Sequence, residues 1–181
     1  TDGSGIEVPS INGTTTTVTD HGNVTIQGQS VNGTGVVLPD LNVSGNGTVD
    51  IGGTSTNGSG AVVTPNTTVN ISGNGAADIS GDSKNGNGTV IDGAVNVTEN
   101  GTINISGNST DGTGVLIDTN GSINTSGDGS TNISGGSTNG TGADINGSIN
   151  TTDSGTINIS GNSTAGTGVV VDPNGSINTS G

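Results

Sequence analysis

The chain has 181 residues, 37 of them glycine, and a formal net charge of −14. It has no aromatic residue, cysteine, methionine or arginine, and Lys84 is its only lysine. This composition excludes a globular core built on aromatic and leucine packing, and it excludes electrostatic binding to nucleic acid or anionic membranes. No apolar run of about 18 residues predicts a membrane span, and no signal peptide is recognisable.

A unit of about 26 residues recurs along the chain and carries the signature Gly-x-Ser-x-x-Gly-x-Gly. The intervals between successive signatures are 25, 28, 26, 28 and 26 residues. Repetition at this period predicts a solenoid, in which each unit buries its apolar face against its neighbours. The signature begins at Gly28, Gly53, Gly81, Gly107, Gly135 and Gly161.

Each unit contains three pairs of mostly apolar residues, and the two members of a pair are separated by one residue. Such pairs predict short strands with one face inside the molecule. The first strand holds Val24/Ile26, Val49/Ile51, Ala77/Ile79, Ile103/Ile105, Thr131/Ile133 and Ile157/Ile159. The second holds Val36/Leu38, Ala61/Val63, Thr89/Ile91, Val115/Ile117, Ala143/Ile145 and Val169/Val171. The third holds Leu41/Val43, Val69/Ile71, Val95/Val97, Ile123/Thr125, Ile149/Thr151 and Ile177/Thr179.

The spacing between these strands indicates how they stack. The first and second strands of a unit always start twelve residues apart, and a third strand and the next first strand always start eight apart. All variation in length lies between the second and third strands, where a loop can bulge outward. This predicts an all-β fold, a parallel β-helix with three short strands per rung of about 26 residues and about seven rungs.

We expect residues 1–181 to form one β-helix segment that is a fragment of a longer exoprotein. Ile6/Val8 and Thr16/Val18 would belong to an incomplete first rung. One isoleucine from each unit should stack in a dry column, namely Ile26, Ile51, Ile79, Ile105, Ile133 and Ile159. The predicted rungs are 1–22, 23–47, 48–75, 76–101, 102–129, 130–155 and 156–181.

Asparagine is expected at the corners and on the outside of the coil. Asn-Gly pairs such as Asn46 and Asn100 are predicted to supply the positive φ that a reversal of chain direction needs. Of the 25 asparagines, 23 lie in Asn-x-Ser/Thr, which is the acceptor motif for N-linked sugar in exported proteins. Outward stacking of asparagine explains the same pattern without sugar. The most accessible glycosylation candidates are Asn57, Asn108, Asn139 and Asn162 in the signature loop and Asn66, Asn120 and Asn174 at the variable corner.

The sequence gives little support for catalysis. The acidic residues are scattered, and the only histidine, His21, has no evident partner. Asp92, Asp118 and Asp172 share a corner position, but the glycine-rich nonapeptide of calcium-binding β-rolls is missing. We therefore predict no enzyme activity, no catalytic or metal-binding residue and no cofactor.

Two outward features of the predicted strands leave binding functions open. Polar columns on the first and third strands suggest an ice-binding solenoid as an alternative, although such faces usually rest on paired threonines. Val37, Val62, Val90, Leu116 and Val170 on the second strand form an outward apolar column, interrupted by Asp144. This column either reflects β-propensity or contacts another segment or a partner.

Two units in particular resemble the repeats of large bacterial surface exoproteins. They begin Gly101-Thr-Ile-Asn-Ile-Ser-Gly-Asn-Ser and Gly155-Thr-Ile-Asn-Ile-Ser-Gly-Asn-Ser. The chain is most similar to two-partner-secreted, filamentous-haemagglutinin-like adhesins, including the high-molecular-weight adhesins, and autotransporter passengers use similar coils. The resemblance implies a right-handed β-helix, export through an outer-membrane partner, attachment to host cells and, in some members, hexoses on Asn-x-Ser/Thr.

From residues and resemblance together we expect a non-enzymatic, structural and adhesive repeat region outside the bacterial cell or on its surface. Its partners would be a receptor or glycan on the host cell and an outer-membrane secretion protein. The alternatives are an ice-binding solenoid, an autotransporter stalk that makes no receptor contact, and a degenerate polysaccharide-processing helix.

Overall fold

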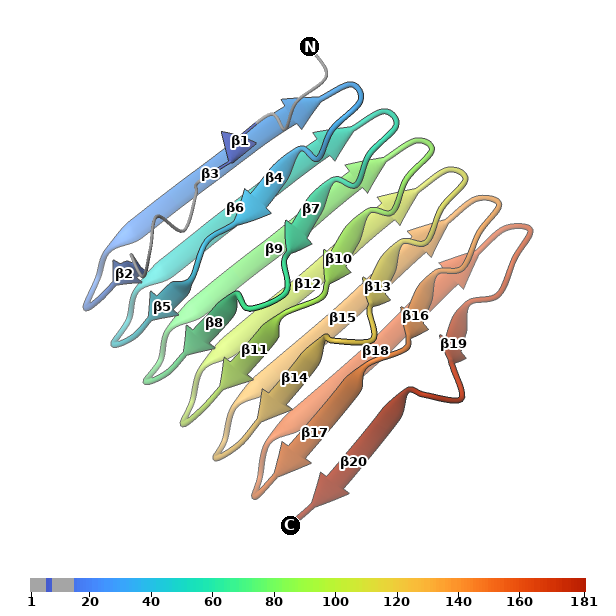
Figure 1. Cartoon of the computed structure of the whole chain (residues 1–181). Helices are drawn as coiled ribbons and strands as arrows, with labels where there is room; N and C mark the ends of the chain where they lie inside the picture. The colour runs from blue at the N-terminus through green and yellow to red at the C-terminus, as the bar shows by residue number, and fades with distance from the viewer. Residues whose placement is uncertain (1–5, 8–14) are drawn as a thin grey trace.

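The computed structural model describes residues 6–7 and 15–181, and all regular structure in them is β. The strands wind into a coil of six complete turns, preceded by a partial turn, and every strand pairs in parallel with its counterpart one turn away (Figure 1). Three parallel sheets therefore run along the coil. The predicted parallel β-helix with three strands per turn is confirmed.

The first sheet holds the longest strands, eight residues each: β3 (Asn23–Ser30), β6 (Thr48–Ser55), β9 (Ala76–Ser83), β12 (Thr102–Ser109), β15 (Ser130–Ser137) and β18 (Thr156–Ser163). The second sheet holds β1 (Ile6–Glu7), β4 (Val36–Leu38), β7 (Ala61–Val63), β10 (Thr89–Ile91), β13 (Val115–Ile117), β16 (Ala143–Ile145) and β19 (Val169–Val171). The third holds β2 (Thr16–Val18), β5 (Leu41–Val43), β8 (Thr68–Ile71), β11 (Ala94–Val97), β14 (Ser122–Thr125), β17 (Ser148–Thr152) and β20 (Ser176–Ser180).

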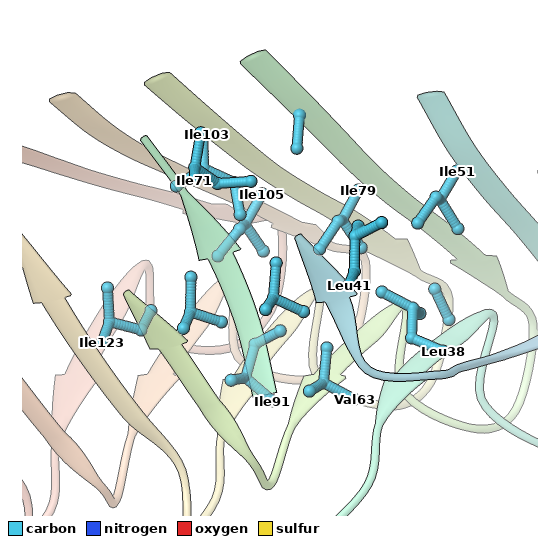
Figure 2. Packing of buried hydrophobic residues seen from close by; sticks show 14 of the residues in the cluster. Leu38, Leu41, Ile51, Val63, Ile71, Ile79, Ile91, Ile103, Ile105 and Ile123 are labelled. Atoms are coloured by element: carbon cyan, nitrogen blue, oxygen red, sulfur yellow. The ribbon is translucent and has the colours of Figure 1, made fainter. Parts of the chain in front are cut away.

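The strand register places equivalent residues of successive units directly above one another. Ile105 of β12 pairs with Ile79 of β9 on one side and with Ile133 of β15 on the other. The core is the column of inward aliphatic side chains inside the three sheets (Figure 2). Each fully buried valine, leucine or isoleucine contributes roughly 1.5 to 3 kcal/mol, so the repeated inward pairs account for the cohesion of the coil.

The predicted isoleucine column is present in register from Ile26 to Ile159. Its four central members are at most 1 % exposed, while Ile26 and Ile159 are partly buried against the core cluster. In the last turn the inward side chains are more open, because no further turn stacks on them in the structure. Val169, Val171 and Ile177 are exposed there.

The partial turn also follows the predicted register. Thr16 and Val18 of β2 pair with Leu41 and Val43. Ile6 of β1 pairs with Val36. Val8, which was predicted to be the second inward residue of that strand, lies outside the described residues.

The first strand of each unit is longer than its apolar pair predicts. In β12 it continues beyond Ile105 through Gly107 to Ser109, and both of these added residues are buried. The interior of the coil therefore includes a glycine and a serine column beside the aliphatic side chains. The apolar alternation does not show this extension, because glycine and serine carry no hydrophobic signal.

The corners before the first strands differ from the prediction in one respect. In the Ser72–Gly75 turn, the Gly75 N–H donates to the Ser72 carbonyl at 3.0 Å, and Gly73, not Asn74, has the positive φ. Positive φ at only the first central residue defines a type II′ turn. The expectation that the Asn-Gly pairs supply the positive φ is wrong at these corners, because the residue before each pair has it. The residues that do so are Asp20, Gly45, Gly73, Glu99, Gly127 and Asp153.

Candidate functional site

The signature serine is bonded in two directions within the coil. The Ser109 hydroxyl accepts the Gly112 N–H at 2.8 Å and donates to the carbonyl oxygen of Gly86, one turn away, at 2.7 Å. The same pair of bonds is made by Ser55, Ser83, Ser137 and Ser163. One hydroxyl therefore closes its own loop and ties it to the preceding turn. The fixed Ser-x-x-Gly spacing is the sequence signal for this role, which the apolar pattern alone does not reveal.

The first glycine of the signature is required by a close backbone approach. A Cβ built on Gly107 would overlap the carbonyl oxygen of Gly114, the last glycine of the same signature. The corresponding glycines of the other units meet the same obstacle. The repeated spacing of the signature thus reflects how the loop folds onto its strand, and its serine and glycines are engaged in the coil's own structure.

Asparagine side chains form a continuous ladder along the outer face of the third sheet. The Asn124 side-chain amide donates to Oδ1 of Asn96 at 3.0 Å, and the Asn150 amide donates to Oδ1 of Asn124 at 2.9 Å. Each asparagine between the two ends of the ladder donates one side-chain hydrogen bond to the preceding turn and accepts one from the following turn. The complete ladder runs through Asn42, Asn70, Asn96, Asn124, Asn150 and Asn178.

A second long ladder on the first sheet begins on an acid. Asn104 donates to the Asp78 carboxylate at 2.6 Å, and Asn132 and Asn158 continue the column. In every ladder the later residue in the chain donates and the earlier one accepts. A carboxylate can only accept, and Asp78, Asp82, Asp92 and Asp111 each accept from the asparagine one turn later.

Four of the seven glycosylation candidates donate their side-chain amides within such ladders. They are Asn57, Asn108, Asn120 and Asn139, with acceptors Asn32, Asp82, Asp92 and Asp111 respectively. Among the described residues, the other three, Asn66, Asn162 and Asn174, are exposed and have no side-chain hydrogen bond. Asn108 and Asn162 were expected in the signature loop, but they lie on the outer face of β12 and β18, because the first strand extends that far.

Asn66 has the most distinctive backbone of the candidates. The Thr67 N–H donates to the Thr64 carbonyl at 3.0 Å, with Pro65 and Asn66 between them and a φ of 68° at Asn66. Proline followed by a residue with positive φ is the pattern of a type II turn. This turn holds the Asn66 side chain at the exposed tip of its corner.

The outward apolar column on the second sheet is present and partly covered. Val90 is 9 % exposed, and Leu116 pairs with Asp144, which in turn pairs with Val170. One carboxylate oxygen of Asp144 is buried and has no hydrogen-bond partner among the described residues. Burial raises the pKa of the Asp144 carboxyl, and the nearby charges of Asp172 and Asp118 raise it further.

The corners between the second and third strands alternate in length. Long corners separate Val63 from Val69, Ile117 from Ile123 and Val171 from Ile177, and short corners occupy the turns between them. Long corners therefore recur at every second turn, roughly 9.6 Å apart at a strand spacing of about 4.8 Å. The intervals between successive signatures already show this alternation, since they are 25, 28, 26, 28 and 26 residues long. Interval length alone, however, does not distinguish the alternation from ordinary variation in loop length.

A groove of about 320 Å³ lies between two of these long corners. Pro65, Asn66 and Thr67 line one side, Asn120 lines the other, and Asp92 lies on the short corner between them. The Asn120 amide donates to Oδ1 of Asp92 at 3.0 Å, which ties the long corner to the short one. The groove is shallow and open to solvent.

The remaining candidate residues do not converge on a reactive centre. Asp92 accepts from Asn120, and Asp118 accepts the Thr119 N–H at 2.7 Å. His21 is exposed at a corner. Within residues 15–181, no group of three or more histidine, aspartate or glutamate side chains is placed to hold a metal ion. No helix long and apolar enough to cross a membrane occurs in the same part of the chain.

Comparison with protein-family models, with curated proteins and with solved structures finds no match for this chain. Function is therefore inferred from the residues of the coil and from its geometry.

Proposed function

We propose that the chain is a structural and adhesive repeat segment of an exported bacterial surface protein, which mediates attachment to host cells. Export through an outer-membrane partner belongs to the same proposal. The residues that resemble two-partner-secreted adhesins lie in the Gly101 and Gly155 units. The chain's fold, composition and outer surface each support a role in which rigid length and a polar exterior are the useful properties.

One observation carries the proposal: asparagine and serine side chains form hydrogen bonds from one turn of the coil to the next, parallel to its axis. The Asn42–Asn178 ladder joins six successive turns, and the signature serines join turns in the same direction. Continuous side-chain and backbone ladders stiffen a coil lengthwise. A protein that holds a contact away from a cell surface needs this property.

The side of the coil that carries the second sheet and the long corners is the best candidate for receptor contact. It combines the outward column that includes Leu116 and Val170 with the groove between Asn66 and Asn120. Apolar side chains flanked by polar groups at regular spacing are suited to binding a host protein or glycan. The outer faces of the first and third sheets instead carry hydrogen-bonded asparagine ladders.

Sugar on asparagine is a further part of the proposal. Asn66, Asn162 and Asn174 present amide nitrogens that no ladder uses, so attaching a hexose there breaks no bond within the coil. In Asn57, Asn108, Asn120 and Asn139 the same nitrogen is bonded within a ladder, so a sugar there would take one of its two hydrogens and crowd the ladder bond. We expect glycopeptides from the native host to carry sugar mainly at the first three sites. Sugar confined to the four ladder residues, or its absence, would contradict this part of the proposal.

Adhesion can be tested with beads coated with the purified segment. The beads should bind cultured host epithelial cells under flow, and soluble segment should compete for the binding. A variant with Leu116→Asp and Val170→Asp tests the second sheet. Thr102→Asp with Thr156→Asp adds the same charge on the outer face of the first sheet, at positions that flank Ser130 and belong to no ladder. Loss of binding only in the first variant supports contact through the second sheet.

The same assay separates adhesion from spacing. If coated beads do not bind, but beads that carry a known ligand on the end of the segment bind better than beads with that ligand on a short flexible linker, the segment acts as a stalk. Failure in both formats would refute the structural and adhesive role.

An ice-binding surface is the alternative favoured by the flat, in-register first sheet. Its outward columns repeat Ser, Thr and Asn over six strands. The charged side chains of Asp50, Asp78 and Asp82 interrupt those columns and weigh against this alternative. Measurable thermal hysteresis of the purified segment would favour ice binding over adhesion.

A further inference from the structure

Asn-Gly pairs are unusually frequent in this chain, and 11 of them lie in residues 15–181. In a flexible chain such pairs are chemically labile. The backbone nitrogen of the glycine attacks Cγ of the asparagine, the Cγ–Nδ2 bond breaks and ammonia leaves. Water then opens the resulting succinimide ring to give aspartate or isoaspartate. The reaction needs a free glycine N–H and an asparagine amide that can turn towards it.

The coil engages the glycine N–H of every one of these pairs. In the signature loop the acceptor is a serine hydroxyl, as in the 2.9 Å bond from Gly86 to Ser83. Gly33, Gly58 and Gly140 are held in the same way. The other seven, Gly47, Gly75, Gly88, Gly101, Gly121, Gly147 and Gly175, donate to backbone carbonyls.

The asparagine amide is held as well in three of the signature loops. Asn85 donates to Asn57, Asn57 donates to Asn32, and Asn139 donates to Asp111, each at 2.7 Å. To react, Asn85 would have to leave its ladder and Gly86 would have to leave the serine. Both the nucleophile and the group that it attacks are therefore restrained at these positions.

We propose that the asparagines two residues after a signature serine are latent deamidation sites, and that the serine slows their reaction by holding the N–H of the next glycine. These asparagines are Asn32, Asn57, Asn85 and Asn139. Conversion of Asn85 would replace the amide that donates to Asn57 with a carboxylate, which cannot donate. Isoaspartate would also lengthen the backbone by one methylene in a coil whose register depends on fixed spacing. The serine thus protects a long-lived polar surface from damage by water, a role beyond its part in shaping the loop.

The loop that contains Lys84 offers an internal control. Asn87 lies two residues after Asn85 in the same loop, but its glycine, Gly88, donates to the carbonyl of Thr113, at 2.9 Å, and not to a serine. Ser83→Ala removes the acceptor of Gly86 and leaves the Thr113 acceptor in place. The variant should expose Asn85 to reaction and spare Asn87.

The experiment incubates the folded chain and the Ser83→Ala variant at mildly alkaline pH and follows each asparagine by peptide mapping. We expect Asn85 to deamidate about tenfold faster in the variant, equivalent to about 1.4 kcal/mol, with Asn87 and Asn139 unchanged. Equal rates at Asn85 in the two proteins would overturn the proposal. So would a wild-type rate at Asn85 as fast in the folded chain as in urea.

If Ser83→Ala unfolds the chain, deamidation should become faster at all the Asn-Gly pairs and not at Asn85 alone. In that case Ser137→Ala, read at Asn139, supplies an independent test, since Gly140 donates to Ser137 at 2.9 Å. Faster reaction at Asn139 alone supports the proposal. If that variant stays folded and Asn139 does not accelerate, the serine has no protective role.

Discussion

The hydroxyl groups of Thr125 and Thr131 lie 2.7 Å apart inside the coil, at the corner between β14 and β15. Thr125 is 1 % exposed and Thr131 is fully buried. Each hydroxyl is therefore the other's hydrogen-bond partner in a mostly aliphatic interior.

Thr125→Val should leave the Thr131 hydroxyl buried without that partner. We expect a loss of about 1 to 3 kcal/mol in the free energy of unfolding. The double variant Thr125→Val/Thr131→Val should recover most of the loss, because both polar groups are removed together. A double-mutant cycle by urea unfolding measures the coupling. Additive losses in the double variant would show that the two hydroxyls do not depend on each other.

Thr151 offers the opposite case one turn further along. Its hydroxyl oxygen is buried and has no hydrogen-bond partner among the described residues. Thr151→Val keeps the branched shape and removes the unsatisfied group, so it should raise the free energy of unfolding by about 1 kcal/mol. The neighbouring Thr152 is exposed, and Thr152→Val should change stability little. Destabilisation by Thr151→Val would contradict this account of the interior.

Asp144 should make the stability of the coil depend on pH. Its pKa is raised by burial, and then by Asp172 and Asp118, so the folded chain holds this proton more tightly than the unfolded chain. The stabilising effect of the proton is full below the unfolded pKa of about 3.9, and it is lost as the pH rises through the higher folded value. Asp144→Leu should therefore stabilise the coil at pH 7, and the advantage should shrink towards pH 3.

Denaturant unfolding of this variant across the pH range checks the prediction. Asp128→Asn is the matched control, since it removes one negative charge from an exposed corner. An equal gain from both variants at pH 7 would show that net charge, and not the partly buried position of Asp144, limits stability.

The direction of the asparagine ladder predicts an asymmetric response to charge. Asn124 donates to Asn96 and accepts from Asn150, whereas Asn42 accepts from Asn70 and begins the ladder. Asn124→Asp should cost about 1 kcal/mol, because a carboxylate cannot donate. Asn42→Asp keeps its only ladder bond and should cost less, measured in moderate salt to screen the charge of Asp40. Equal costs at the two positions would refute the assigned direction.

The spacing of apolar residues was sufficient to predict the three strands, their register and the isoleucine column from Ile26 to Ile159. Hydrophobic periodicity reports which side chains face inward, and the strict offsets left one way to stack them. The bond from Ser109 to Gly86 and the direction of the Asn124 ladder depend on polar contacts between turns, which the apolar pattern does not encode. The positive φ expected of the Asn46-Gly47 pair lies instead on Gly45, because glycine and asparagine both tolerate it and the sequence does not show which residue enters the turn first.

Because long and short corners alternate, the true repeat of this coil is a pair of turns, and repeats should be gained or lost in such pairs. Gly53 and Gly107 are 54 residues apart, and Gly107 and Gly161 are separated by the same number. A duplication or deletion of one such pair would leave the row formed by the Asn66, Asn120 and Asn174 corners in phase, whereas loss of a single turn would bring two equal corners together. Length variants of this coil are therefore expected to differ by whole pairs of turns.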